Sequence, residues 1–140
     1  MNPLHLATLY TAFVNQGDVL KPTLRYEENY HSKIWIEKAF SEEVSSTVLE
    51  GIKLVVNNPK GTGYVAHNDD VVLAGKTGTA EIKSSKNDTS GTELGWFVVT
   101  TTGETDKPIM LVSMVEDVKN IGGSGYVAKK DAEVLNKWFK

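Results

Sequence analysis

The chain has 140 residues, of which 40% are apolar and 24% are charged, with a formal net charge of −3 and no cysteine. This composition fits one folded domain, or part of a larger one, and excludes a disordered chain. The slight negative charge gives no reason to expect nucleic acid as a partner, and the lack of cysteine excludes disulfides and thiol catalysis.

The chain begins with a segment that predicts a helix. Asn2 is a good N-cap with Pro3 at the first helical position, and Gly17 stands where a helix would stop in the left-handed conformation. Between them, apolar residues recur at the spacing of one helix face. The predicted face consists of Leu6, Leu9, Tyr10, Phe13 and Val14.

The next segments predict extended chain and then a second helix. Residues 19–35 are interrupted by Pro22, so we expect extended structure with a short hairpin around residues 29–33. Ser41 predicts the cap of a helix that ends at residues 57–59, followed by a flexible connection at residues 60–63. The predicted buried stripe of this helix is Val44, Val48, Ile52, Val55 and Val56.

From residue 71 onward the pattern becomes that of β-structure. A polar loop and a hairpin turn separate three expected strands, and a glycine-rich segment precedes a last helix. The expected strands are residues 71–82, 95–101 and 109–116, the turn is 103–106, and the last helix has Val127, Val134, Leu135 and Trp138 on one face. We therefore predict an α+β fold with an antiparallel sheet of about three strands packed with helices.

The first of these strands carries the most informative motif, Lys76-Thr77-Gly78-Thr79. A cation, two hydroxyls and a position without a side chain suit a substrate carboxylate next to an acyl-transfer centre. A phosphate-binding P-loop is disfavoured because Asp70 stands where its first glycine is required, and β-like sequence follows. The plainer alternative is an edge strand with a bulge at Gly78 and a solubilising Lys76.

Other candidate residues give weaker signals. The three histidines, His5, His31 and His67, lie in unrelated segments without ligand spacing. Asp69 and Asp70 follow Asn68 directly before a strand and are typical of a turn. The sequence therefore predicts no metal and no cofactor.

Taken together, these motifs resemble those of the transpeptidase domain of penicillin-binding proteins. The resemblance runs from the opening Asn-Pro-Leu helix through Ala74-Gly75-Lys76-Thr77-Gly78-Thr79-Ala80-Glu81 to Gly95-Trp96-Phe97 and the final helix. It is greatest to class B, low-affinity resistance-type enzymes of Gram-positive bacteria. It implies a partial serine β-lactamase/transpeptidase-like fold, with residues 1–140 as the C-terminal part of such a domain.

The resemblance also implies a function and roles for single residues. In this family a serine attacks a D-Ala-D-Ala stem peptide of peptidoglycan, and β-lactams acylate the same serine. Lys76 would supply positive charge near the reacting groups, and Thr77 and Thr79 would bind the substrate's carboxylate. The backbone N–H of Thr79 would form half of the oxyanion hole, and Gly78 would leave room for the peptide. The parent protein would work at the extracytoplasmic face of the plasma membrane, held there only by an N-terminal anchor absent from this chain.

The chain departs from the family in lacking the nucleophile. No serine has a lysine three residues later, as S-x-x-K requires; the serines considered are Ser32, Ser41, Ser45, Ser46, Ser84, Ser85, Ser90, Ser113 and Ser124. The triplet Ser85-Lys86-Asn87 follows the K-T-G motif, whereas the family places its S-x-N before it. We therefore expect a truncated polypeptide that is inactive alone, whose exposed sheet favours self-association.

Two alternatives remain at this point. The chain could be a non-catalytic binding or structural module that retains the K-T-G sheet. It could also be the tail of a serine β-lactamase or a β-lactam sensor, which shares the same sheet, although the first helix and Gly95-Trp96 favour the penicillin-binding protein.

Overall fold

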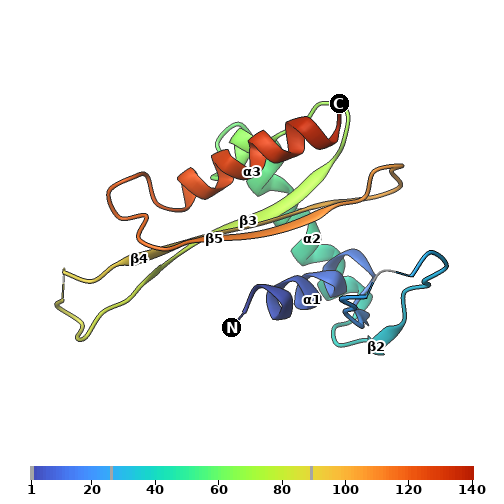
Figure 1. Cartoon of the computed structure of the whole chain (residues 1–140). Coiled ribbons are helices and arrows are strands. Elements are labelled where there is room, and N and C mark those ends of the chain that lie inside the picture. Colours follow the sequence, from blue (N-terminus) through green and yellow to red (C-terminus); the bar gives the residue numbers. More distant parts are fainter. Residues whose placement is uncertain (1, 26, 89) are drawn as a thin grey trace. The chain divides into compact units, whose positions relative to one another are not determined.

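The computed structural model describes residues 2–25, 27–88 and 90–140. The chain forms two compact units, residues 1–51 and 52–140, and the boundary between them falls within helix α2 (Glu42–Asn57). The second unit holds the Lys76–Thr79 motif, in a three-stranded sheet accompanied by helix α3 (Ser124–Trp138) (Figure 1).

The first unit begins with helix α1 (Pro3–Val14), whose ends match the sequence prediction. The Asn2 side chain accepts a hydrogen bond from the His5 N–H at 2.8 Å, so it caps the helix. Gly17 has φ +101°, and a Cβ added there would lie 2.0 Å from the Phe40 carbonyl oxygen. Only glycine fits this turn without strain.

The loop of the hairpin in the first unit is longer than predicted. Strands β1 (Val19–Leu20) and β2 (Ile34–Ile36) pair antiparallel and are joined by residues 21–33, of which 28–29 form a turn. A hairpin is present, but it is not the short one predicted around residues 29–33, because its paired strands lie at the two ends of the predicted segment. Pro22 explains this in part, because proline cannot donate a hydrogen bond to continue a ladder.

The buried faces of the first two helices differ from the predicted stripes. In α1 the buried residues are Thr8 and Ala12, whereas Leu9 is 41% exposed. In α2, Val56 is buried as predicted, but Ser45 is buried as well and Val44 is 47% exposed. Small side chains allow close packing at the buried positions. The periodicity of apolar residues does not predict which small or polar residues are buried.

The sheet of the second unit consists of β3 (Leu73–Glu81), β4 (Glu93–Thr101) and β5 (Met110–Val115) in the order β3-β4-β5, all antiparallel. Each strand lies within two residues of its predicted bounds, so the predicted α+β fold is confirmed. The register of β3 on β4 runs without a shift from Leu73↔Thr101 to Glu81↔Glu93. The bulge considered at Gly78 is therefore absent.

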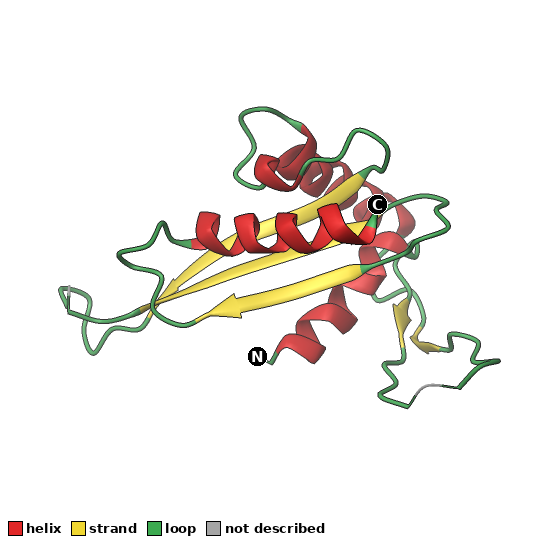
Figure 2. Ribbon diagram, turned by 45° about the horizontal axis from the view of Figure 1, so that its top comes forward, coloured by secondary structure: helices red, strands yellow, loops and turns green. Residues whose placement is uncertain are grey.

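Helix α3 runs along one face of this sheet (Figure 2). The odd-numbered residues of β3 and β4 share that face, because side chains alternate along a strand. A cluster of apolar side chains forms most of the core there. Its buried members are Val56, Ala66, Leu73, Phe97, Val99, Val118, Val127, Ala128, Ala132 and Leu135.

The buried face of α3 corrects another prediction. Val127 and Leu135 are buried as expected, but Val134 is 47% exposed and Trp138 is 46% exposed. An acidic residue, Asp131, takes part in the buried face instead, with 4% exposure. The Trp138 indole is held at the surface by its hydrogen bond to the Lys107 carbonyl oxygen, at 3.1 Å.

Asp131 is a buried acid with only one of its oxygens satisfied. Its Oδ1 accepts a hydrogen bond from the Ser113 hydroxyl of β5 at 2.6 Å, whereas its Oδ2 is buried and finds no partner among the described residues. Burial raises the pKa of the Asp131 carboxyl, and the Ser113 hydrogen bond partly opposes this increase. Ionised Asp131 therefore destabilises the packing of α3 on the sheet.

This arrangement gives a prediction for the pH dependence of stability. The folded chain holds the Asp131 proton more tightly than the unfolded chain, so stability falls as pH rises from ~4 through the raised pKa. We expect Asp131→Asn to be more stable than the wild type at pH 7.5, and this advantage to shrink at pH 4.5. Urea unfolding of both proteins at the two pH values measures the difference, and an equal difference at both would contradict the prediction.

Candidate substrate-binding edge

The Lys76–Thr79 motif lies in the middle of β3, at the edge of the sheet. Lys76 and Gly78 present their side-chain positions to the face opposite α3, and Thr77 and Thr79 present theirs to the α3 face. Lys76 and Thr79 are exposed and Thr77 is buried. The four residues predicted from sequence thus lie together on one edge strand, on both of its faces.

Two hydrogen bonds establish which backbone groups of β3 face outward. The Ile82 N–H donates to the Thr92 carbonyl at 2.9 Å, and the Thr102 N–H donates to the Val72 carbonyl at 3.0 Å. Even-numbered residues of β3 therefore bond to β4, because paired residues alternate along an antiparallel ladder. It follows that the N–H and C=O groups of Thr77 and Thr79 point to the outer edge.

Thr77 takes part in two hydrogen bonds at this edge of the sheet. The Lys76 ammonium donates to the Thr77 carbonyl oxygen at 2.6 Å, which agrees with an outward-facing carbonyl. On the α3 face, the Thr77 hydroxyl lies 2.7 Å from the Thr62 hydroxyl. Thr62 was not predicted as a site residue, because only the fold brings it to a strand that lies 15 positions away.

Thr62 is held by a tight turn between α2 and the short helix η1 (Tyr64–Ala66). We expected a flexible connection here, but the segment is tied by hydrogen bonds. The Gly61 N–H donates to the Asn58 carbonyl at 2.7 Å, and the Gly63 N–H donates to the Val55 carbonyl at 3.0 Å. The turn therefore places the Thr62 hydroxyl against β3.

Thr79 faces the glycine-rich turn that precedes α3. A Cβ added at Gly123 would lie 3.7 Å from the Thr79 hydroxyl oxygen, so the two positions are close. Gly123 is the N-cap of α3 and has φ +61°. The Thr79 hydroxyl therefore lies beside a backbone position that carries no side chain.

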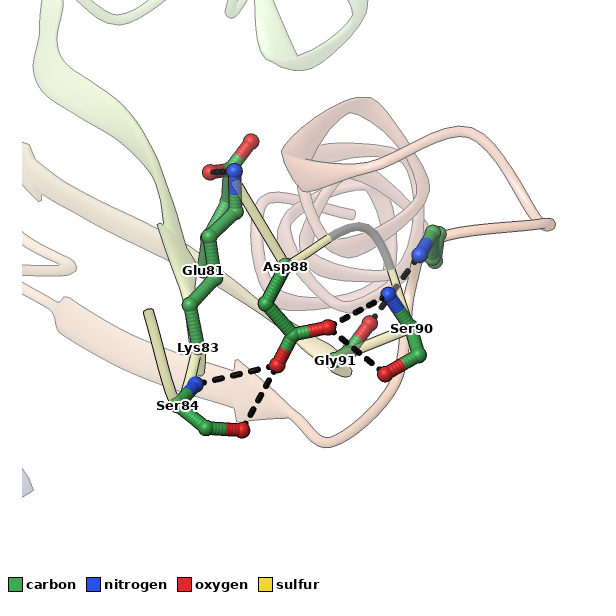
Figure 3. Close-up of polar contacts among 7 residues, drawn as sticks. Glu81, Lys83, Ser84, Asp88, Ser90 and Gly91 are labelled. Atoms are coloured by element: carbon green, nitrogen blue, oxygen red, sulfur yellow. Dashed lines mark hydrogen bonds and ion pairs between the residues drawn. The ribbon is translucent and has the colours of Figure 1, made fainter. Parts of the chain in front are cut away.

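The loop between β3 and β4 is organised around Asp88 (Figure 3). Its carboxylate accepts hydrogen bonds from the backbone N–H and hydroxyl groups of Ser84 and Ser90, at 2.6–3.0 Å. These bonds from Ser90 and Ser84 hold the pKa of Asp88 well below its usual range. The Ser85-Lys86-Asn87 triplet lies in this loop, where Ser85 accepts a turn hydrogen bond from the Asp88 N–H at 3.1 Å.

Asn68 organises the turn that was predicted to precede β3. Asn68 Oδ1 accepts hydrogen bonds from the N–H groups of Asp70 and Val71, which confirms the predicted turn. No group of three potential metal ligands occurs among the residues that the structure describes. Within the same residues, no helix has the length and apolar character to cross a bilayer.

The arrangement along β3 is suited to binding an anion next to an extended chain. It offers the Lys76 ammonium, two threonine hydroxyls, and backbone N–H groups directed outward from the sheet edge. Charged and neutral donors of this kind bind carboxylates and stabilise oxyanions. The free edge also suits an extended peptide, which can add to it as a further strand.

The chain is similar to known proteins over most of its length. Penicillin-binding protein 3 of Bacillus subtilis (strain 168) is 41% identical over 130 residues, which cover 93% of this chain but 19% of that protein. The apo structure of the TP domain from Burkholderia pseudomallei penicillin-binding protein 3 matches with a TM-score of 0.68 at 20% identity, over 98% of this chain and 43% of that chain. The family model described as the penicillin binding protein transpeptidase domain matches residues 1–140. The chain therefore belongs to the penicillin-binding protein transpeptidase family, as its resemblance to class B members indicated.

Proposed function

We propose that the chain forms the substrate-binding side of the active site of a serine D,D-transpeptidase. This enzyme cross-links peptidoglycan stem peptides and is acylated by β-lactams. The observation that carries this proposal is the outward direction of the Thr77 and Thr79 backbone groups on the edge strand that also bears Lys76. Membership in the family makes transpeptidation the chemistry that best uses this edge.

Each residue has a separate role in the proposed reaction. The Thr77 and Thr79 hydroxyls bind the terminal carboxylate of a D-Ala-D-Ala stem or of a β-lactam. The Thr79 N–H stabilises the oxyanion that forms when a serine attacks the carbonyl. Lys76 holds positive charge beside the reacting groups, and Gly78 keeps its face open to the peptide.

The serine itself is not among residues 1–140. None of the serines is followed by lysine at the third position, and Ser85-Lys86-Asn87 lies in the loop stabilised by Asp88. We infer that an S-x-x-K serine and an S-x-N motif from a longer protein complete the site. The 140-residue chain alone is then inactive, because a hydroxyl nucleophile and its base are both missing.

The whole protein's setting is part of the same proposal. Its substrates lie outside the cytoplasm, so we place it at the extracytoplasmic face of the bacterial plasma membrane, anchored by a segment outside residues 1–140. Within the family, we propose that the whole protein is a class B enzyme of the low-affinity resistance type, as its sequence suggests.

Labelling with fluorescent penicillin tests the proposal. In acylation the serine oxygen bonds to the lactam carbonyl carbon, the lactam C–N bond breaks, and the ring nitrogen gains a proton. We expect a stable adduct with the complete transpeptidase that carries these residues, and none with the 140-residue chain, detected by gel fluorescence and mass spectrometry. An adduct on the 140-residue chain, or failure of the complete protein to be labelled, would overturn the proposal.

A further inference from the structure

The contact between the Thr62 and Thr77 hydroxyls joins the proposed carboxylate site to a residue outside β3. The two oxygens lie 2.7 Å apart, within the usual range for a hydrogen bond between hydroxyls. Thr77 is 7% exposed, whereas Thr62 lies at the surface. Thr62 is therefore a neighbour that can fix the direction of the Thr77 hydroxyl.

A threonine hydroxyl has one proton to donate and two lone pairs to accept with. The 2.7 Å contact can thus run in either direction in the absence of a ligand. Once Thr77 gives its proton to a carboxylate, its oxygen can only accept, so Thr62 must become the donor. The resulting chain, from Thr62 to Thr77 to the carboxylate, is strengthened because hydrogen bonds in series polarise one another.

The turn that holds Thr62 supports such a role. A Cβ added at Gly61 would lie 2.2 Å from the Val55 carbonyl oxygen, so the turn lies directly against the end of α2. The Lys60 N–H adds a bond to the Asn58 side chain at 2.9 Å. Held in this way, the Thr62 hydroxyl is positioned before a ligand arrives, which reduces the cost of ordering the donor on binding.

We propose that Thr62 is a positioning residue for carboxylate recognition, acting through Thr77 by donating the hydrogen bond that leaves the Thr77 proton for the substrate. This inference rests on the proposed function, and it adds a residue from the α2–η1 turn to the site. It also predicts selectivity: Thr62 matters for ligands with a free carboxylate and not for their neutral esters.

The test compares Thr62→Val, which is similar in shape but has no hydroxyl, with Thr62→Ser, which keeps it. In the complete transpeptidase, the second-order rate of acylation is measured with benzylpenicillin and with its methyl ester. Thr62→Val should slow acylation by the acid roughly five- to tenfold, the effect of losing one ordinary hydrogen bond, and leave the ester rate unchanged. Thr62→Ser should restore most of the rate with the acid.

A double variant tests whether Thr62 acts through Thr77. In a Thr77→Val background, Thr62→Val should have no further effect, because the hydroxyl that it positions is gone. Melting of the 140-residue chain controls for folding, and we expect the Thr62→Val midpoint to stay within about 3 °C of the wild type.

The outcomes distinguish failure of the proposed function from failure of the inference about Thr62. If the wild type is not acylated at all, the proposed function fails and this inference fails with it. If the wild type is acylated and Thr77→Val is impaired, but Thr62→Val is unchanged or slows acid and ester equally, only the inference about Thr62 is overturned.

Discussion

Gly75→Ala should lower the free energy of unfolding of the sheet-containing unit by about 2–3 kcal/mol, the usual cost of overpacking a close-packed site. A Cβ at Gly75 would lie 2.6 Å from the Val98 carbonyl oxygen and 3.0 Å from a Val56 methyl group. The carbonyl belongs to the neighbouring strand and cannot move without disturbing the ladder. Urea unfolding followed by tryptophan fluorescence measures the loss.

Gly78→Ala is the matched control on the same strand. A Cβ there would meet only the Trp96 Cβ, at 3.8 Å, which is an ordinary contact. Gly78 is also not among the residues with positive φ, so alanine can adopt its backbone conformation. We expect unchanged stability or a gain of up to about 1 kcal/mol. Equal destabilisation by both substitutions would show that the packing around Gly75 has been misjudged.

The same control probes function. The position of the Gly78 side chain lies on the face of β3 that carries Lys76, where we expect the substrate peptide to pass. Gly78→Ala in the complete transpeptidase should therefore slow acylation by benzylpenicillin while the protein remains as stable as the wild type. The two substitutions together distinguish a glycine required for stability, Gly75, from a glycine proposed to be required for catalysis, Gly78.

Lys76→Ala should have the opposite pattern to Gly75→Ala, a large loss of activity with little loss of stability. Lys76 is exposed, and the structure gives its ammonium a hydrogen bond only to the Thr77 carbonyl within the described residues. Its removal should change the free energy of unfolding by no more than about 0.5 kcal/mol. Under the proposed role of Lys76 beside developing negative charge, its loss should slow acylation about 100- to 1,000-fold.

Lys76→Arg provides the control for charge alone. Arginine keeps the positive charge, but its planar fork cannot replace a compact ammonium at a tight site. We expect partial recovery, with an acylation rate between those of Lys76→Ala and the wild type. The measurements are stopped-flow acylation in the complete protein and urea unfolding of the 140-residue chain. A Lys76→Ala protein acylated at the wild-type rate would exclude a catalytic role for this lysine.

Much of the sheet could be predicted from sequence because its signals are local. The apolar lead-in residues Val71-Val72-Leu73 and the strand-like residues 95–101 predicted strands within two residues of the observed bounds. The motif at Lys76 could be assigned to a strand for the same reason. The caps at Asn2 and Gly17 were also predictable, since each acts within one turn of chain.

The missed features depend on contacts between distant segments. The Thr62–Thr77 pair forms only because the turn after α2 returns to β3, and nothing in the local sequence around Thr62 marks it. Asp131 was not among the residues predicted for the face of the last helix, and acids are rarely buried; the hydroxyl of Ser113, on another element, satisfies one of its oxygens. Trp138 and Val134 were predicted to share one face with Val127 and Leu135 because all four are apolar, but Ala128 and Ala132 lie on the buried face in their place.

The most direct test of the central claim is a titration of the ¹⁵N-labelled 140-residue chain with acetyl-D-alanyl-D-alanine and with its C-terminal amide. If the outer edge of β3 binds a carboxylate, the acid should shift the backbone N–H signals of Thr77 and Thr79 at the lowest ligand concentrations. The amide should shift the same signals far less. Equal shifts with both ligands, or shifts centred on the Asp88 loop instead of β3, would contradict the account.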